Sequence, residues 1–260
     1  MDELLVKLWE KYTTLAPMAI EIKNLIDTKE NKNVSNDHIA LRTLAHPKIG
    51  VEVLGSIFIN HGYKKCESYN FKEKKLSANY YEHPNPLYPK VFISELRFEE
   101  LSQEAQVIAN TIIDSIVKTK SDNLLLSDRN WQISYTSYKE LYKESEYLAW
   151  FYVFGFVVNH FTIFLNDTGF KDIQEINTWL EEKGYILNSS GGKIKGKGNN
   201  KLEQSSTMAQ YMKIKFSDGI HNIPSCYYEF AKRYPQNDGK LYPGFIESSA
   251  NTIFESTNQS

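Results

Sequence analysis

The chain has few of the features that mark secreted, membrane or nucleic-acid-binding proteins. It contains only two cysteines in 260 residues, Cys66 and Cys226, and their spacing predicts neither a metal site nor a disulfide framework. Its first residues lack a basic segment followed by an apolar core, and its longest apolar run, Leu148 to Val158, is too short to span a bilayer. The net charge of −2 indicates no basic surface for nucleic acid or anionic membrane. We therefore expect a cytoplasmic protein with no nucleic-acid or membrane partner, and its oligomeric state is left open.

What the chain does contain is an internal repeat. His38 opens one strand-like run (DHIALRT), and His160 opens another (NHFTIFL) 122 residues later. A helical stretch follows in each half, over 51–61 and 173–183, and in each half a glycine stands 24 residues after the histidine, where it can end the helix in the left-handed conformation. Two further strand-containing runs complete each half: 76–82 and 91–98 in the first, 202–211 and 226–233 in the second. The sequence directly after each glycine, from Tyr63 and from Tyr185, is also strand-like, so the repeat predicts two β-α-β-β-β modules.

The segments outside the repeat are mostly helical in pattern. Apolar residues at helical spacing predict one or two helices over 2–27, a helix over 99–118 and further helical sequence over 137–151. The Gly/Lys-rich segment 189–198 lacks the ending of a phosphate-binding loop and is predicted to connect strands, with a role as a lid left open. The expected organisation is an α+β fold in one compact unit, in which the two modules form an open barrel: an N-terminal helical cover (1–34), a first module (35–98), a helical insertion (99–155), and a second module with its tail (156–260). The insertion either walls one end of the barrel or contacts a partner subunit.

Two histidines and a glutamate suggest a metal site. Two imidazoles and one carboxylate on a single face leave coordination positions open, as in non-haem Fe(II) oxygenases. His38 and His160 stand at equivalent strand starts, and Glu229 lies in an aromatic strand, where burial is costly unless the carboxylate is paired or bound to metal. The alternative for Glu229 is an ion pair with Arg233. Glu95, which takes the matching place in the first half, is expected to be structural or to support the site.

Several polar residues are candidates for binding substrate. Arg42 lies four residues after His38, so on a strand the two side chains face the same cavity. A guanidinium there suits bidentate capture of a substrate carboxylate; the alternative is a buried partner for Glu95. Gln204 and Ser206 lie on one face of a predicted strand and are candidate pocket residues, although a solvent-facing strand would have the same pattern.

The motifs DHIALRT, VNHFT, QSSTMA, YYEFAKR and a final FEST together resemble those of the DUF1338 family. That family belongs to the vicinal oxygen chelate superfamily and includes 2-oxoadipate dioxygenase/decarboxylase, and the resemblance covers the chain from about residue 35 to residue 257. It implies a vicinal-oxygen-chelate-like barrel and the following site: His38, His160 and Glu229 as Fe(II) ligands, Arg42 as the catalytic contact to the substrate carboxylate, and Ser256 of the last motif as a further substrate-binding residue.

The resemblance also implies a reaction. A 2-oxo acid would chelate Fe(II) through its 2-oxo and C1-carboxylate oxygens, and O2 would take a remaining position, so that 2-oxoadipate is converted into 2-hydroxyglutarate and CO2 without a separate 2-oxoglutarate. One alternative is another metal-dependent enzyme on the same scaffold, such as a lyase, an isomerase or a ring-cleaving dioxygenase. Another is a non-catalytic protein that binds a small molecule, and a third is a structural role for both histidines in the core.

Overall fold

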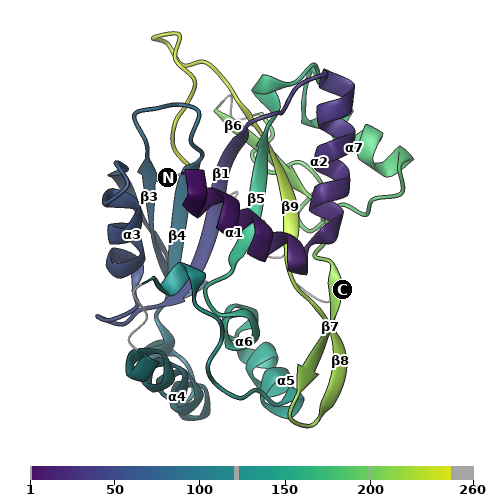
Figure 1. The fold of residues 1–260 in the computed structure, drawn as a ribbon. Helices are drawn as coiled ribbons and strands as arrows, with labels where there is room; N and C mark the ends of the chain where they lie inside the picture. Colours follow the sequence, from purple (N-terminus) through teal and green to yellow (C-terminus); the bar gives the residue numbers. More distant parts are fainter. Residues whose placement is uncertain (1, 120–122, 199–200, 247–260) are drawn as a thin grey trace.

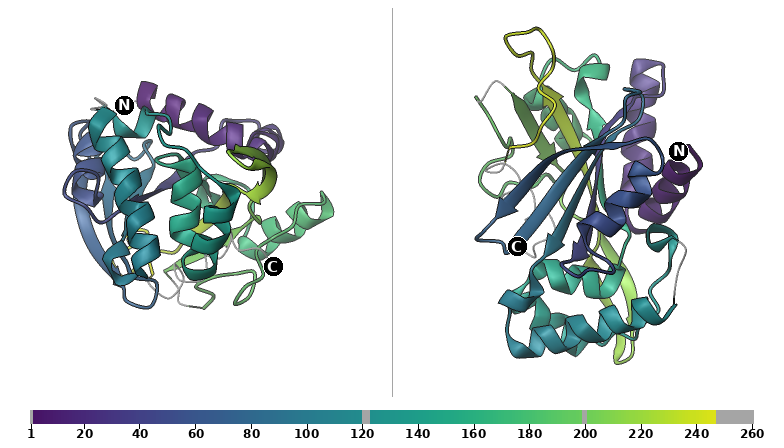
Figure 2. Two further views of the ribbon diagram at one scale, coloured as in Figure 1. Left: turned by 90° about the horizontal axis from the view of Figure 1, so that it is seen from below. Right: turned by 90° about the vertical axis from the view of Figure 1, so that its left-hand side faces the viewer.

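A curved β-sheet assembled from both halves of the chain forms the centre of the molecule (Figures 1 and 2). The computed structural model describes residues 2–119, 123–198 and 201–246. Within these residues the sheet has seven strands in the order β2-β3-β4-β1-β5-β9-β6. Their bounds are β1 (Asn36–Leu44), β2 (Lys64–Phe71), β3 (Leu76–Glu82), β4 (Lys90–Leu96), β5 (Val158–Phe164), β6 (Leu202–Ser206) and β9 (Tyr227–Arg233).

The predicted repeat is confirmed by the pairing of the strands. In the first half β1 runs parallel to β4, in the second half β5 runs parallel to β9, and β1 and β5 pair antiparallel where the halves meet. The helices α3 (Val51–Ile59) and α7 (Ile173–Glu182) follow the first strand of each half. Gly62 and Gly184 come just after them with φ of 96° and 86°, the left-handed conformation that glycine adopts without steric cost.

The second module is less regular than predicted. The strand expected after Tyr185 is reduced to two isolated bridges, one between Leu187 and Thr207 and one between Lys195 and Gln204. The reason lies in the intervening glycines, because Gly191, Gly192, Gly196 and Gly198 all have positive φ, which an extended strand does not allow.

Lys195 of this Gly/Lys-rich segment is only 3% exposed. Its ammonium group donates hydrogen bonds to the carbonyl oxygens of Ser190 and Gly192, so it stabilises the loop from within and does not face solvent as a phosphate ligand would.

A hairpin that the pattern did not predict interrupts the second module. The expected single strand over 202–211 ends at Ser206, and β7 (Tyr211–Phe216) and β8 (Gly219–Pro224) then pair as a separate two-stranded sheet. The hairpin leaves the main sheet near the lower end of the view in Figure 1 and lies beside α5.

The predicted helical segments are present, and the N-terminal stretch forms two helices, the second of which begins at Pro17. The bounds are α1 (Asp2–Leu15), α2 (Pro17–Glu30), α4 (Gln103–Thr119), α5 (Tyr135–Glu144) and α6 (Glu146–Phe154), with short 3-10 turns η1 (Phe98–Glu100), η2 (Leu124–Leu126) and η3 (Leu165–Asp167). None of the helices in the described ranges combines the length and the apolar character needed to cross a membrane.

The helices α1, α3 and α7 cover one face of the sheet and leave the other face for the site. Trp9 and Tyr12 of α1 contact Phe161 of β5, with ring centroids 4.9 and 5.0 Å apart, and Asn177 of α7 accepts a hydrogen bond from Ser205 of β6. Side chains alternate along a strand, so the neighbours of these contact residues project from the opposite, concave face.

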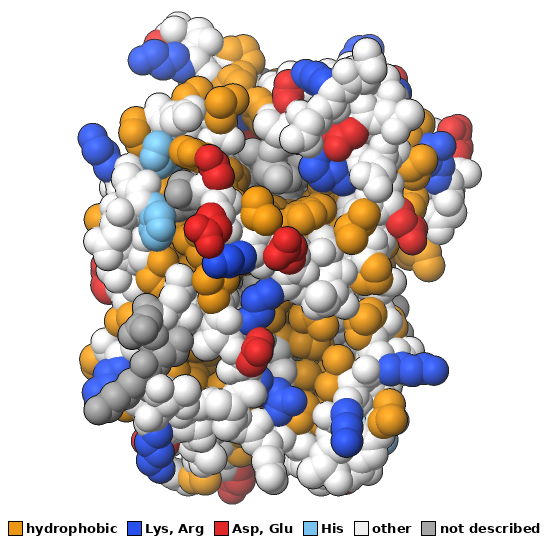
Figure 3. All heavy atoms as spheres, viewed as in Figure 1, with side chains coloured by type: hydrophobic (Ala, Val, Ile, Leu, Met, Phe, Trp, Pro, Cys, Tyr) orange, Lys and Arg blue, Asp and Glu red, His pale blue; other side chains and the backbone are white. Residues whose placement is uncertain are grey.

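The helical insertion covers one end of the sheet, which is the first of its two predicted roles. Seen from below, α4, α5 and α6 lie across that end (Figure 2, left), and α6 contacts β1 through Arg42, whose guanidinium pairs with Glu146. On the face shown in Figure 3, acidic and basic side chains are interspersed, without a large area of one sign.

Candidate metal centre

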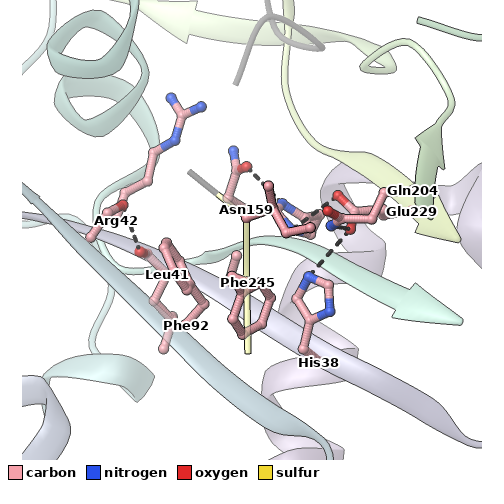
Figure 4. Close-up of a pocket in the computed structure, with 12 residues that line it drawn as sticks. His38, Leu41, Arg42, Phe92, Asn159, Gln204, Glu229 and Phe245 are labelled. Atoms are coloured by element: carbon pink, nitrogen blue, oxygen red, sulfur yellow. Dashed lines mark hydrogen bonds and ion pairs between the residues drawn. The ribbon is translucent and has the colours of Figure 1, made fainter. Parts of the chain in front are cut away.

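His38, His160 and Glu229 converge on the concave face although they lie far apart in the sequence. The register explains this, because His38 pairs with Thr162 and Thr162 pairs with Glu229, while His160 lies opposite Ala40. The Nε2 atoms of His38 and His160 are 3.3 and 3.5 Å from the carboxylate oxygens of Glu229. One atom that could bind a metal from each of the three residues lies within 4.8 Å of the others, and all three side chains are buried. Figure 4 shows His38 facing Glu229 across the cluster.

The residue before each histidine orients its ring. His38 Nδ1 is 2.7 Å from Asp37 Oδ1, and His160 Nδ1 is 3.1 Å from Asn159 Oδ1. Because carboxylate and amide oxygens accept hydrogen bonds, each Nδ1 carries a proton, and each Nε2, the atom through which a neutral imidazole would bind a metal, faces Glu229. Metal-binding histidines in proteins are held in this way.

The electrostatic environment differs between the two histidines. Burial alone would lower the pKa of His38, but the hydrogen bonds to Asp37 and Glu229 outweigh it and raise the pKa. Burial, reinforced by the positive charges of His38 and Arg42, lowers the pKa of His160 well below its ordinary value. His160 is therefore neutral at neutral pH, whereas the raised pKa of His38 means that a metal ion would compete with a proton for its Nε2.

Glu229 fits a metal ion better than it fits its protein neighbours. Its carboxylate is 0% exposed; Oε1 accepts a 2.5 Å hydrogen bond from Gln204, whereas Oε2 has no hydrogen-bond partner among the described residues. Two ligand atoms about 2.1 Å from one ion are about 3.0 Å apart at a right angle and about 3.4 Å apart at the tetrahedral angle. The observed separations, 3.3 Å to Oε1 and 3.5 Å to Oε2, are close to the upper of these values, so the three residues could hold a metal with positions left for other ligands.

A cavity adjoins His38, His160 and Glu229. Its walls are mainly apolar, with a few polar groups; besides these three residues it is lined by Ala40, Leu41, Arg42, Phe92, Ser94, Asn159, Gln204, Phe245 and Ile246. Apolar walls with a small number of placed polar groups are typical of small-molecule sites.

Arg42 reaches this cavity, as predicted, but with an ion-pair partner that the sequence did not indicate. Its guanidinium donates to both carboxylate oxygens of Glu146, at 2.9 and 3.2 Å, and lies over the rings of Tyr147 and Trp150. The alternative pairing with Glu95 is wrong, because that side chain projects from the opposite face of the sheet.

Comparison with known proteins places the chain in a family. A sequence model described as 2-oxoadipate dioxygenase/decarboxylase matches residues 9–240. The chloroplastic 2-oxoadipate dioxygenase/decarboxylase of Arabidopsis thaliana is 33% identical over 278 residues, which cover 95% of this chain and 75% of that protein. The chain belongs to the 2-oxoadipate dioxygenase/decarboxylase family.

Solved structures share the fold of this chain. A Shewanella frigidimarina protein described as a putative hydrolase is 44% identical, with a TM-score of 0.89 over 95% of this chain and 97% of that chain. The hydroxyglutarate synthase of Oryza sativa, solved in complex with 2-oxoadipate, is 31% identical with a TM-score of 0.89 over 98% of this chain and 91% of that chain. A Ralstonia eutropha protein assigned to the glyoxalase superfamily is 18% identical with a TM-score of 0.75, over 93% of this chain and 84% of that chain, and shows the shared fold. The predicted vicinal-oxygen-chelate architecture is confirmed.

Glu95, which the sequence pattern matched to Glu229, is not its structural counterpart in the first half. Tyr227 pairs with His160 as Lys90 pairs with His38, so the position equivalent to Glu229, two residues on, is Phe92. Glu95 projects to the other face, where its carboxylate accepts a 2.8 Å hydrogen bond from the Val51 N–H at the start of α3. The first module therefore has a histidine but no matching carboxylate.

The alternative ion pair between Glu229 and Arg233 is also wrong. Arg233 donates two hydrogen bonds to Asp37, at 2.6 and 2.8 Å, and both side chains are 2% exposed. The charge of Arg233 keeps the pKa of Asp37 well below its ordinary range although burial opposes this. Sequence reasoning missed both roles; the only local signal was the acidic residue directly before His38.

The remaining predicted pocket residues divide into three cases. Gln204 lines the cavity and donates its hydrogen bond to Glu229. Ser206 lies opposite Glu229 in the register but does not line the cavity. Ser256 lies outside the described residues, so its predicted role stays a prediction.

The segment after β9 packs back on the sheet and forms a wall of the cavity. Phe245 contacts the ring of His38 edge-on, with centroids 4.9 Å apart, and lies 4.9 Å from the ring of Phe92. Arg233 holds this segment by donating hydrogen bonds to the carbonyl oxygens of Tyr242 and Gly244, at 2.9 and 2.8 Å. The same guanidinium therefore contacts the partner of a metal ligand and the wall of the cavity.

Proposed function

We propose that this chain is an Fe(II)-dependent enzyme that converts a 2-oxo acid and O2 into a shortened 2-hydroxy acid and CO2, with 2-oxoadipate giving 2-hydroxyglutarate. The observation that carries the proposal is the buried cluster of His38, His160 and Glu229 beside a mainly apolar cavity, in a chain of this family. The 2-oxoadipate in the related rice structure supports the substrate. Two histidines and one carboxylate on one face favour Fe(II) among the common metals.

The residues around the ligands would prepare the site. Asp37 and Asn159 keep the protons of the two imidazoles on Nδ1, so both Nε2 atoms are available at the same point, and Gln204 holds Oε1 of Glu229. When bound there, Fe(II) would supply the chelation of the 2-oxo acid and the activation of O2. Side chains fixed in advance need no reorganisation when substrate arrives, which is how a site of this kind lowers a barrier.

Arg42 would orient the acid within the cavity. Its guanidinium is 1% exposed, and Glu146 holds it against one wall. A guanidinium has five N–H donors, so a second carboxylate can bind it in addition to Glu146. This contact would fix the position of the substrate relative to the three ligands.

The apolar walls would limit side reactions. Phe92 and Phe245 form part of the lining, where they would exclude water from the space beside His38, His160 and Glu229. Exclusion of water strengthens the contacts to charged groups and keeps reactive species from being quenched.

We also propose that the protein is cytoplasmic. The cytoplasm is a reducing compartment, which would keep exposed Cys66 and buried Cys226 as the free thiols that they are here.

The test is anaerobic loading with Fe(II), then addition of 2-oxoadipate and air, with O2 uptake, CO2 and products recorded. We expect one O2 consumed per 2-hydroxyglutarate and CO2 formed. The variant His160→Ala should lose both iron and turnover, and the matched variant His61→Ala, at an exposed helix end, should keep both. Iron that binds without any O2 uptake would refute the reaction, and absence of iron binding would refute the ligand set.

A further inference from the structure

Asn159 faces the cavity because of an irregularity in the sheet. The register between β1 and β5 shifts at this point: Ala40 pairs with His160 and Leu41 pairs with Val158, so Asn159 has no partner on β1. In a regular strand two consecutive side chains point to opposite faces. The bulge instead lets Asn159 and His160 line the same cavity.

The two polar atoms of the Asn159 amide differ, because Oδ1 has a hydrogen-bond partner and Nδ2 has none among the described residues. Oδ1 accepts the hydrogen bond from His160 Nδ1, which fixes the orientation of the amide, because a histidine that binds metal through Nε2 has its proton on Nδ1. Nδ2 is left as a donor; it is buried and has no hydrogen-bond partner in the part of the chain that the structure describes. In Figure 4 this nitrogen points away from His38 and Glu229.

Asp37, the matching residue in the first half, has hydrogen-bond partners for both of its side-chain oxygens. Asp37 takes the same place before His38 and binds His38 Nδ1, but the donors of Arg233 satisfy its remaining capacity. The second half has a neutral amide at this position and an unfilled donor. A donor that lines a small-molecule cavity and is buried without a partner is complementary to an acceptor on the ligand.

Charge decides which acceptor suits this donor. The three-residue cluster already contains the carboxylate of Glu229, and a second carboxylate at position 159 would repel an acidic substrate, whereas an amide adds no charge. We propose that Asn159 Nδ2 donates a hydrogen bond to a carboxylate oxygen of the bound 2-oxo acid, so that Asn159 is a substrate-binding residue as well as the partner of His160. This inference rests on the proposed function.

The test replaces the amide by its isosteric acid. Asn159→Asp keeps an acceptor for His160 Nδ1 but exchanges the donor for a negative charge. We expect Fe(II) affinity, measured by anaerobic competition with a chelator, to stay within a few-fold of wild type. The affinity for 2-oxoadipate, measured by anaerobic calorimetry on the iron-loaded protein, should fall roughly 10- to 100-fold.

Asn177 provides a matched control. It is 0% exposed, its Oδ1 accepts a 2.6 Å hydrogen bond from Ser205, and its Nδ2 also has no hydrogen-bond partner within the described ranges, yet it lies on α7 away from the cavity. Asn177→Asp should alter the melting temperature and leave the affinity for 2-oxoadipate unchanged. Equal loss of 2-oxoadipate affinity in both variants would overturn the proposal, because the effect would then be one of stability.

Two further measurements keep the proposal testable. If Asn159→Asp does not fold, Asn159→Ala at saturating Fe(II) removes the donor without adding charge, and wild-type affinity for 2-oxoadipate in that variant overturns the proposal. If wild type holds Fe(II) but binds no 2-oxoadipate, the proposed substrate is wrong. The titration with pyruvate, which keeps the chelating 2-oxo carboxylate, then decides: weaker binding by Asn159→Asp supports the donor, and equal binding overturns it.

Discussion

Arg233 links a metal ligand to the wall of the cavity, so its replacement by lysine should affect both. The guanidinium makes four hydrogen bonds, two to the carboxylate of Asp37 and two to the carbonyl oxygens of Tyr242 and Gly244. A lysine ammonium keeps the charge, but as a single point it cannot satisfy both sides of this planar arrangement. The variant Arg233→Lys therefore loses about two hydrogen bonds to charged groups in a buried position.

The magnitude follows from these contacts. Hydrogen bonds to charged groups are each worth about 1.5–3 kcal/mol, and the retained charge offsets part of the loss, so we expect a fall of about 2–4 kcal/mol in the free energy of unfolding of Arg233→Lys. Since Asp37 then orients His38 less firmly, Fe(II) affinity should fall about 10- to 100-fold, as is usual when the partner of a metal-binding histidine is disturbed.

The assay is urea unfolding of the metal-free protein together with anaerobic Fe(II) competition. Arg97→Lys is the control, because Arg97 is half-buried and binds Glu100 and Asn70 away from the site. It should change both quantities little. A loss of stability with wild-type Fe(II) affinity in Arg233→Lys would show that the Asp37–Arg233 pair does not act through His38. Unchanged stability would refute the ion-pair argument itself.

Three further outcomes are expected. Glu229→Gln should lower Fe(II) affinity by more than the roughly 10- to 100-fold typical of outer-shell changes, while the metal-free protein stays folded, because a buried carboxylate is removed; wild-type iron binding in this variant would exclude Glu229 as a ligand. Burial opposes the raised pKa of His38, but the hydrogen bonds to Asp37 and Glu229 outweigh it. The stability that protonated His38 adds to the metal-free protein is therefore fully present below about pH 6.5 and is lost as the pH rises through the raised pKa. Fe(II) binding must displace that proton, so its affinity, measured by competition at pH 6, 7 and 8, should rise with pH by up to about tenfold per unit, and pH-independent binding would contradict this reasoning. Phe245→Ala should let water reach the space beside His38, so that more O2 is consumed than product is formed. Its stability loss should stay below the roughly 3–5 kcal/mol of a central Phe→Ala change, because Phe245 belongs to no strand or helix. O2 consumption equal to product formation in this variant would exclude Phe245 as a barrier to water.

The parts of the site that the sequence predicted are those that a local pattern can reveal. The repeat was visible because His38 and His160 each precede a strand-like run, a helix and a glycine at the same interval. Glu229 was visible because a charged residue inside an aromatic strand needs a partner. Glu95 was misassigned as its counterpart because spacing along the chain does not show register, and a shift of one residue moves a side chain to the other face.

The rest depended on contacts between segments far apart in the sequence. Glu146 reaches Arg42 from a helix more than one hundred residues later, and Arg233 reaches Asp37 from the last strand of the sheet. No periodic pattern or characteristic spacing relates the two members of either pair, so the sequence alone could not have indicated these contacts. The β7–β8 hairpin and the loss of a regular strand after Tyr185 were likewise set by turn geometry and by glycines with positive φ.

The sequence by itself determined the repeated modules and the helical segments, and it indicated His38, His160 and Glu229 as candidate metal ligands, because hydrophobic periodicity and residue chemistry are local properties. Only the tertiary structure decided how these three residues are brought together and supported. Strand register brought Glu229 beside both histidines, and the bulge turned Asn159 into the cavity. Those placements follow from long-range pairing of backbone hydrogen bonds, which depends on the whole sheet and not on any one segment of the chain.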